Sequence, residues 1–191
     1  MVAFQQDIDN CLDVLQKGGL IVYPTDTVWA IGCDATSEAA VTRLLALRQC
    51  PSPVPMVVLM AEERDILHYV AQPDLLIFDY IKGVSKPTTV VYEAGIGLAS
   101  SLLAEDGSVA IRICTDEFCR HLIKRFRKPI VGTAAALQGY PAPAFFRDIE
   151  PIVTEGVDYI VQYRRWEEDR PGRPSSVIRW EKDGSLRVIR S

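Results

Sequence analysis

The chain has 191 residues, 48% of them hydrophobic and 24% charged, and a formal net charge of −4. This composition is that of a globular chain large enough to bury a core, and we expect one domain over residues 1–191. The net charge of −4 argues against a wholly basic nucleic-acid-binding surface, although it is compatible with a local basic patch. No apolar run approaches the roughly 20 residues that span a bilayer, so no membrane partner is expected.

The amino-terminal half alternates predicted helices and strands. Ile8, Leu12 and Leu15 recur at helical spacing, and Gly18-Gly19 follow as a stop signal. In order, the sequence predicts a helix over 5–17, a strand over 20–23, a helix opening at Ser37, a proline-rich loop over 51–55, a strand over 56–60 and one or two helices between 61 and 81.

The carboxyl-terminal half is richer in strands. It predicts strands over 88–92 and 108–113, a helix capped by Thr115, a short apolar segment over 129–132, a strand over 157–161 and a hairpin of 175–180 with 185–189. Residues 164–174 are the most loop-like segment. Because strands and helices interleave irregularly, we expect an α/β domain with a twisted mixed sheet rather than a doubly wound one.

The five cysteines, Cys11, Cys33, Cys50, Cys114 and Cys119, include no Cys-x-x-Cys pair. Their odd number and the lack of an N-terminal signal segment predict reduced thiols in a cytoplasmic protein.

A polar triplet follows the first predicted strand. The apolar run Leu20–Tyr23 ends at Pro24, which cannot donate to a sheet ladder. Thr25, Asp26 and Thr27 therefore lie just past a strand end, where open α/β sheets place ligands. The alternative is that these side chains only satisfy the local backbone of a turn.

Two further hydroxyl pairs lie at the ends of predicted strands: Thr88 with Thr89, and Ser175 with Ser176. Candidate cations in the sequence are Arg48, Arg112, Arg173 and Arg190. Hydroxyls combined with arginines suit an anionic ligand such as a phosphate or a carboxylate. Arg112 interrupts an apolar strand, so it needs a partner or a cleft, whereas any other single arginine is more commonly a solvated surface group.

Several familiar sites are missing from the sequence. It has no Gly-x-x-x-x-Gly-Lys phosphate loop, no Gly-x-Gly-x-x-Gly and no His-Glu-x-x-His. With His68 and His121 as the only histidines, a histidine triad or a zinc site is not expected. The basic run 120–128 fits a solvated helix end better than an RNA contact.

In their order along the chain, these motifs resemble the Sua5/YciO/YrdC family of threonylcarbamoyl-AMP synthases. The segment Gly18–Asp34 is similar to the family's opening motif, with Trp29-Ala30-Ile31 in place of Tyr-Gly-Leu. Lys86–Val90, Val109–Ile113, Pro174–Ile178 and Ile189-Arg190 match its later segments. The chain resembles the short form, without an additional carboxyl-terminal domain.

The resemblance implies a YrdC/RibB-like fold, with a twisted mixed sheet and flanking helices around a concave cleft. It implies condensation of L-threonine, bicarbonate and ATP into threonylcarbamoyl-AMP with release of pyrophosphate, for t6A modification of tRNA. Magnesium would assist, and no metal-ligating residues are expected. Several members of the family bind RNA, so the resemblance also implies tRNA or double-stranded RNA as a candidate partner. In this chain it assigns Thr25, Asp26, Thr27, Arg112 and Thr133 to the substrate, Arg48 to catalysis, and Arg48, Thr89, Ser175, Ser176 and Arg190 to the nucleotide.

Two departures leave a second interpretation open. The family's Lys-x-Arg becomes Arg48-Gln49-Cys50, and its Thr-Ser-Ala-Asn becomes Thr133-Ala134-Ala135-Ala136. Each lost polar contact costs on the order of 1–3 kcal/mol of binding or transition-state stabilisation. The chain is therefore either an active synthase with a reworked nucleotide subsite or a divergent paralogue that binds RNA, a nucleotide or a small acid.

Overall fold

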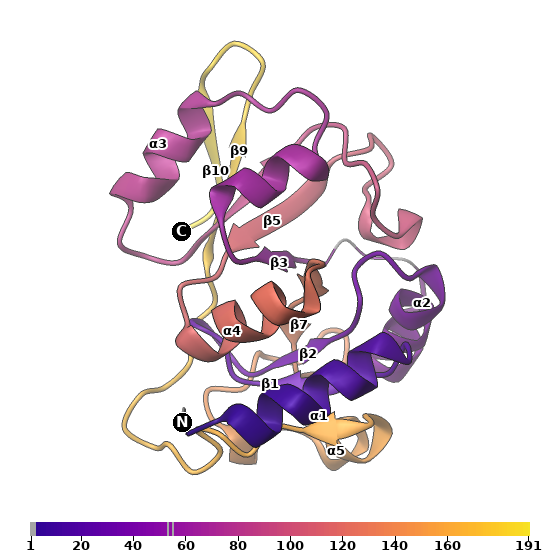
Figure 1. The fold of residues 1–191 in the computed structure, drawn as a ribbon. Helices are drawn as coiled ribbons and strands as arrows, with labels where there is room; N and C mark the ends of the chain where they lie inside the picture. The colour runs from indigo at the N-terminus through magenta and orange to yellow at the C-terminus, as the bar shows by residue number, and fades with distance from the viewer. Residues whose placement is uncertain (1–2, 53, 55) are drawn as a thin grey trace.

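The computed structural model describes residues 3–52, 54 and 56–191, so Pro53 and Pro55 of the predicted proline-rich loop lie outside the described residues. The helices are α1 (Gln5–Gln16), α2 (Glu38–Leu47), α3 (Leu76–Gly83), α4 (Glu117–Phe126) and α5 (Pro151–Gly156), with short 3-10 helices η1 (Glu63–His68), η2 (Ser100–Leu102) and η3 (Phe146–Asp148). The predicted α/β class is confirmed (Figure 1).

The strands of the described residues form two sheets rather than one. The first has the order β7-β2-β1-β8 and contains β1 (Ile21–Tyr23), β2 (Ala30–Gly32), β7 (Thr133–Ala134) and β8 (Tyr159–Ile160). The second has the order β10-β9-β4-β5-β3-β6 and contains β3 (Val58–Met60), β4 (Thr88–Tyr92), β5 (Val109–Ile113), β6 (Ile130–Val131), β9 (Ser176–Trp180) and β10 (Leu186–Arg190). Both sheets mix parallel and antiparallel pairs.

Local sequence signals set most element boundaries. Gly18, at φ +76°, ends the turn after α1 in the left-handed region that glycine adopts without a Cβ clash. The Ser37 side chain caps α2 by accepting from the Ala40 N–H. The predicted hairpin is confirmed, with Gly184 at φ +81° between β9 and β10.

The predicted cap of α4 is wrong by one residue. Asp116, not Thr115, is the N-cap, and its carboxylate accepts from the Cys119 N–H. Both residue types cap helices well, but Thr115 is occupied elsewhere, because its N–H and hydroxyl donate to Asp26. A contact distant in sequence thus decides between two adjacent candidates.

The core lies between the sheets and their helices. Figure 1 shows α1 and α4 side by side, and the fully buried Ile8 and Leu15 of α1 and Phe118 and Leu122 of α4 belong to the same hydrophobic cluster. The amino end of α4 lies beside the loop that follows β1. There the Cys119 thiol, in the first turn of α4, donates to the Pro24 carbonyl at 3.2 Å. Within the described ranges, no helix is long and apolar enough to cross a membrane.

Candidate functional site

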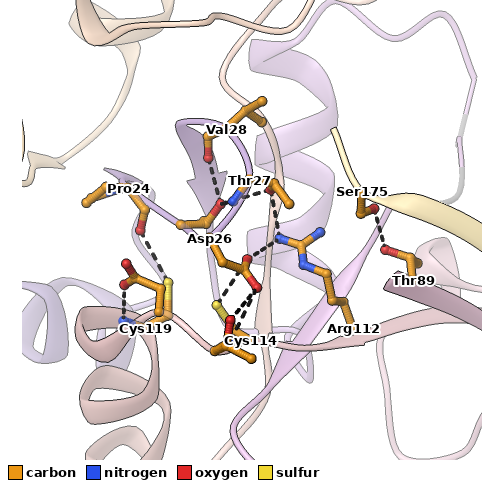
Figure 2. A network of polar contacts seen from close by, with 12 residues as sticks. Pro24, Asp26, Thr27, Val28, Thr89, Arg112, Cys114, Cys119 and Ser175 are labelled. Carbon is orange, nitrogen blue, oxygen red and sulfur yellow. Dashed lines mark hydrogen bonds and ion pairs between the residues drawn. The ribbon is translucent and has the colours of Figure 1, made fainter. Parts of the chain in front are cut away.

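The loop after β1 is held by a chain of hydroxyl groups. The Thr25 hydroxyl donates to the Val28 carbonyl at 2.7 Å and lies 3.0 Å from the Thr27 hydroxyl. Since the single Thr25 proton is used on Val28, Thr27 must donate to Thr25. The Thr27 oxygen in turn accepts from Arg112 Nη2 at 3.0 Å. The turn therefore both satisfies its own backbone and supports the arginine (Figure 2).

Arg112 is the buried cation that its place inside a strand predicts. It is 4% exposed on β5, and its Nη2 lies 3.2 Å from Asp26 Oδ1. Asp26 also accepts from the Thr115 N–H at 3.2 Å and from the Cys114 thiol at 3.4 Å. Arg112 Nε, however, is buried with no hydrogen-bond partner among the described residues. A buried guanidinium with an unused donor suits a carboxylate or phosphate ligand.

A second pair of predicted residues meets next to Arg112. Thr89 on β4 pairs in register with Arg112 on β5. The Thr89 hydroxyl lies 2.8 Å from the Ser175 hydroxyl. Arg190 braces Ser175 by donating from Nε and Nη2 to its carbonyl at 3.0 and 2.9 Å. Figure 2 shows Thr89 and Ser175 on the far side of Arg112 from Asp26. The structure thus joins hydroxyls that are 86 positions apart into one corner, here called the Arg112 corner: Thr25, Asp26, Thr27, Thr89, Arg112 and Ser175.

Arg164 supports this corner from a segment that the sequence marks only as a loop. Its Nη1 donates to the Thr25 carbonyl at 3.1 Å and to Asp116 at 2.8 Å, while Nε contacts Glu167. Burial raises the pKa of the Asp116 carboxyl above its ordinary value, in spite of this nearby guanidinium. The neighbouring Arg173 contributes only its backbone N–H, which donates to the Thr27 carbonyl at 3.2 Å. No local signal places Arg164 at the corner, because its partners there, Asp116 and the Thr25 carbonyl, lie 48 and 139 positions away.

The cysteines near the corner are free thiols, as expected. Cys114 and Cys119 are both fully buried and donate to Asp26 and to the Pro24 carbonyl. Burial raises the pKa of Cys119 far above its ordinary value, so this thiol stays protonated. It is a donor that holds the loop rather than a nucleophile.

Arg48 lies in a separate cluster at the end of α2. Its Nη1 donates to the Thr133 hydroxyl at 2.7 Å and its Nε to the Ala136 carbonyl at 2.9 Å. Burial lowers the pKa of this guanidinium from its usual value. The structure thus brings the predicted residues Arg48 and Thr133 together, but it turns the arginine onto its own chain. We call Arg48, Cys50, Thr133, Ala134, Ala136 and Gln138 the Arg48 cluster.

The departures from the family motifs gather in this cluster. The Cys50 thiol lies 3.6 Å from Gln138 Oε1, and the Gln138 N–H donates to the Arg48 carbonyl at 2.8 Å. Ala134 and Ala136 flank Ala135 in the sequence, and each carries only a methyl side chain. The Ala135 N–H donates to the Trp29 carbonyl at 2.9 Å. The cluster is therefore joined to the loop after β1 through backbone, with a neutral thiol and methyls where the family has a cation, a hydroxyl and an amide.

Two cavities adjoin the Arg112 corner. One reaches Thr25, Thr27 and Trp29 and has a volume of about 10 Å³, room for at most one water. The other, about 480 Å³, is lined by Asp26, Pro87, Thr115, Tyr163 and Arg164 among others. An amino-acid-sized ligand therefore has room beside Asp26, in a cavity that Asp116, Glu117 and Glu167 also line and that Arg112 does not reach. Ser176, assigned by resemblance to the nucleotide, lies at the start of β9 in register with Thr88.

Comparisons with known proteins agree with this architecture. The family model for Sua5/YciO/YrdC, described as telomere recombination, matches residues 13–191. A threonylcarbamoyl-AMP synthase of Stenotrophomonas maltophilia (strain K279a) is 29% identical over 157 residues, which are 81% of this chain and 84% of that protein.

Solved structures show the same fold. E. coli YciO superposes with a TM-score of 0.82 at 21% identity, over 98% of this chain and 89% of that one. P. abyssi Sua5 complexed with L-threonine gives 0.82 at 21% identity, over 97% of this chain; the match spans 54% of the longer Sua5 chain. On the family model and this shared fold, the chain belongs to the Sua5/YciO/YrdC family.

Proposed function

We propose that the protein binds L-threonine at the Arg112 corner and condenses it with bicarbonate and ATP to give threonylcarbamoyl-AMP. The observation that carries the proposal is the unpartnered, buried Nε of Arg112. Its neighbour Nη2 is already engaged by Thr27 and Asp26, which fixes the guanidinium plane. Because this atom is shielded from solvent, a ligand carboxylate would reach and satisfy it once the surrounding side chains move aside.

The relatives support the identity of the amino acid. Threonine is the ligand of P. abyssi Sua5, and the Stenotrophomonas relative is named for threonylcarbamoyl-AMP synthesis. In this reaction the threonine nitrogen forms a bond to the bicarbonate carbon, and water leaves. The resulting carbamate oxygen then bonds to the α-phosphorus of ATP, and pyrophosphate leaves. The product would serve t6A modification of tRNA, as the family resemblance implies.

The protein's contribution to this chemistry is positioning and charge neutralisation. Arg112 would hold the threonine carboxylate, while Thr89, Ser175 and Ser176 would contact the nucleotide, with Arg190 bracing Ser175. Arg48 would meet the phosphates with the donors that Thr133 and Ala136 leave unused. Magnesium would arrive with the ATP phosphates, because no group of three or more His, Cys, Asp or Glu side chains in the described part of the chain is placed to hold a metal.

The geometry of Arg48 favours a second candidate. Two of its donors are spent on the chain itself, and the nearby cationic position of the family motif is Cys50. A protein that keeps the Arg112 corner but adenylates slowly would act as a binder of a small amino acid. The two candidates share the amino-acid site and differ in the nucleotide site.

Threonine-dependent release of pyrophosphate from ATP, with bicarbonate and Mg²⁺ present, tests the first candidate. Release above a no-threonine control supports the synthase. Folded protein that binds threonine but releases no pyrophosphate supports the binder.

A restored variant sharpens the second result. Cys50→Arg with Ala134→Ser and Ala136→Asn returns the cation and two polar groups of the family motifs. If only those losses limit turnover, each restored contact contributes about 1–3 kcal/mol to transition-state binding, and the release rate rises at least tenfold. A restored variant with unchanged rate would place the defect elsewhere. Ser52→Ala, in the loop beyond Cys50, is the matched control.

A further inference from the structure

A third cavity lies at the opposite end of α4 from the Arg112 corner. It has a volume of about 470 Å³ and sits between η1 and the last turn of α4. Because α4 has ten residues, its ends are separated by about 15 Å at 1.5 Å per residue. We call this the η1–α4 cavity; neither the proposed reaction nor the family assignment uses it.

Its lining combines apolar and cationic side chains with the two carboxylates Glu62 and Asp65. Met60, Ala61, Ile123 and Pro129 form apolar parts of the surface. Arg64 and His68 come from η1, while Lys124, Arg127 and Lys128 come from the end of α4 and the residues after it. Cavities of a few hundred Å³ with apolar surface and a few convergent polar groups are the usual form of small-molecule sites.

One carboxylate already occupies the centre of this cationic group. Glu62 lies 2.8 Å from Lys124 Nζ and 2.6 Å from Arg64 Nε. The hydrogen bond from Lys124 lowers the pKa of Glu62, so this carboxyl is ionised at neutral pH. Lys128 pairs outward with Asp34 at 3.2 Å. Lys124 of α4 and Arg64 of η1 thus hold a single carboxylate, that of Glu62, between them.

Arg127 is the cation left without such a partner. It ends α4 in the left-handed conformation, φ +63°, with its N–H on the Ile123 carbonyl at 2.9 Å. Its guanidinium makes no ion pair with any residue that the structure describes. A strained conformation at a non-glycine residue is retained where its surroundings require it.

Helix electrostatics alone do not explain the arrangement. Cations in the last turn offset the partial negative charge of a helix carboxyl end, which accounts for Lys124 and Arg125. It does not account for Arg64, which lines the same cavity from η1. Cationic groups brought from two elements around one apolar floor are the arrangement that an anionic ligand with an apolar body requires.

We propose that the η1–α4 cavity binds a small phosphomonoester of about nucleotide size. Its phosphate would lie between Arg127 and Lys124, displacing Glu62, and its apolar part would rest on Ile123 and Pro129. The chain's overall net charge of −4 and the acidic Glu62 and Asp65 in the wall oppose an extended polyanion, so we commit to a small ligand rather than to RNA. The proposal is independent of the reaction at the Arg112 corner.

Titration with AMP, followed by two-dimensional NMR of backbone amides, tests this at residue resolution. Saturable shifts are expected over residues 61–69 and 123–129, separate from any shifts around Arg48. Arg127→Gln is expected to weaken the binding read from these resonances by about fivefold or more, as loss of one charge-assisted bond does. Glu62→Gln is expected to tighten it by about threefold or more, because the competing carboxylate charge is gone.

Arg125→Gln is the matched control. Arg125 lies on the same helix, pairs with Asp9 at 3.0 Å and does not line this cavity. The affinity of Arg125→Gln for AMP should stay within about twofold of that of the parent protein. The proposal is overturned if saturating AMP leaves the cavity resonances unmoved, or if Arg125→Gln weakens binding as much as Arg127→Gln. It is also overturned if a short RNA duplex moves these resonances with a steep salt dependence while AMP and inorganic phosphate do not.

Discussion

The Arg112 corner and the Arg48 cluster are each built on an arginine, buried at Arg112 and half-buried at Arg48, and the two arginines are used differently. Arg112 is held on one side by Thr27 and Asp26 and keeps Nε free. Arg48 spends two donors on Thr133 and Ala136 of its own chain. Because a guanidinium has five N–H donors, both arginines keep donors for a ligand. They differ in what holds them: two side chains of the loop after β1 hold Arg112, whereas the segment that begins at β7 holds Arg48.

The largest effect is expected at the Arg112–Asp26 pair. Arg112→Met leaves the Asp26 carboxylate buried without its cation, which should lower the free energy of unfolding by about 3–5 kcal/mol. Urea denaturation measures this loss. Adding Asp26→Asn removes the stranded charge and should recover part of the stability. A single variant as stable as the parent would mean that the pair is not buried.

A smaller effect is expected from the hydroxyl chain. Thr27→Val keeps the shape of the side chain but removes the donor to Thr25 and the acceptor for Arg112. We expect a loss of about 1–3 kcal/mol in unfolding free energy and weaker threonine binding, measured by urea denaturation and calorimetry. Thr36→Val is a control for stability without an effect on threonine, because among the described residues the Thr36 hydroxyl bonds only to Asp34, at 2.7 Å. Equal threonine affinities in the two variants would contradict the role of Thr27.

Arg48 tests the other side of the comparison. Arg48→Gln removes the bond to the Thr133 hydroxyl and should cost about 1–2 kcal/mol of stability even without nucleotide. Thermal or urea unfolding of the apo protein measures it. Thr133→Val should cost a similar amount, and the double variant less than the sum, because both remove the same bond. Additive losses would show that the guanidinium is not engaged on Thr133.

The smallest effect belongs to an exposed pair, Arg43 and Asp158, 2.6 Å apart. The hydrogen bond from Arg43 lowers the pKa of Asp158 below its ordinary 3.8. A depressed carboxyl pKa contributes stability above pH 3.8 that is lost as the pH falls through the folded-state value. Solvent screening limits it to about 0.2–1 kcal/mol. Asp158→Asn should thus differ from the parent in urea denaturation at pH 7, and the difference should shrink as the pH falls below 3.8; a constant difference would contradict the linkage.

Much of this arrangement could be predicted where the signal is local. A charge inside the apolar strand Val109–Ile113 indicates a partner or a cleft for Arg112, and both Asp26 and Thr27 supply the partner. The hairpin around Gly184 and the stop after α1 follow from backbone conformations that glycine favours.

Other features depend on contacts distant in sequence. Neither the division of the strands into two sheets nor the role of Arg164 can be predicted locally, because strand order and the partners of a loop arginine are set by packing. The inward direction of Arg48 follows from the position of β7 beside β2, which no motif records. For the same reason, the choice between Thr115 and Asp116 as helix cap required the position of Asp26.

Calorimetric titration of the parent protein with L-threonine, in the absence of nucleotide, tests the central claim most directly. The free donor of Arg112 predicts saturable binding of one equivalent, weakened about tenfold or more in Thr27→Val as the support of the guanidinium is lost. Folded protein that binds ATP but shows no saturable threonine binding would contradict the assignment of the Arg112 corner.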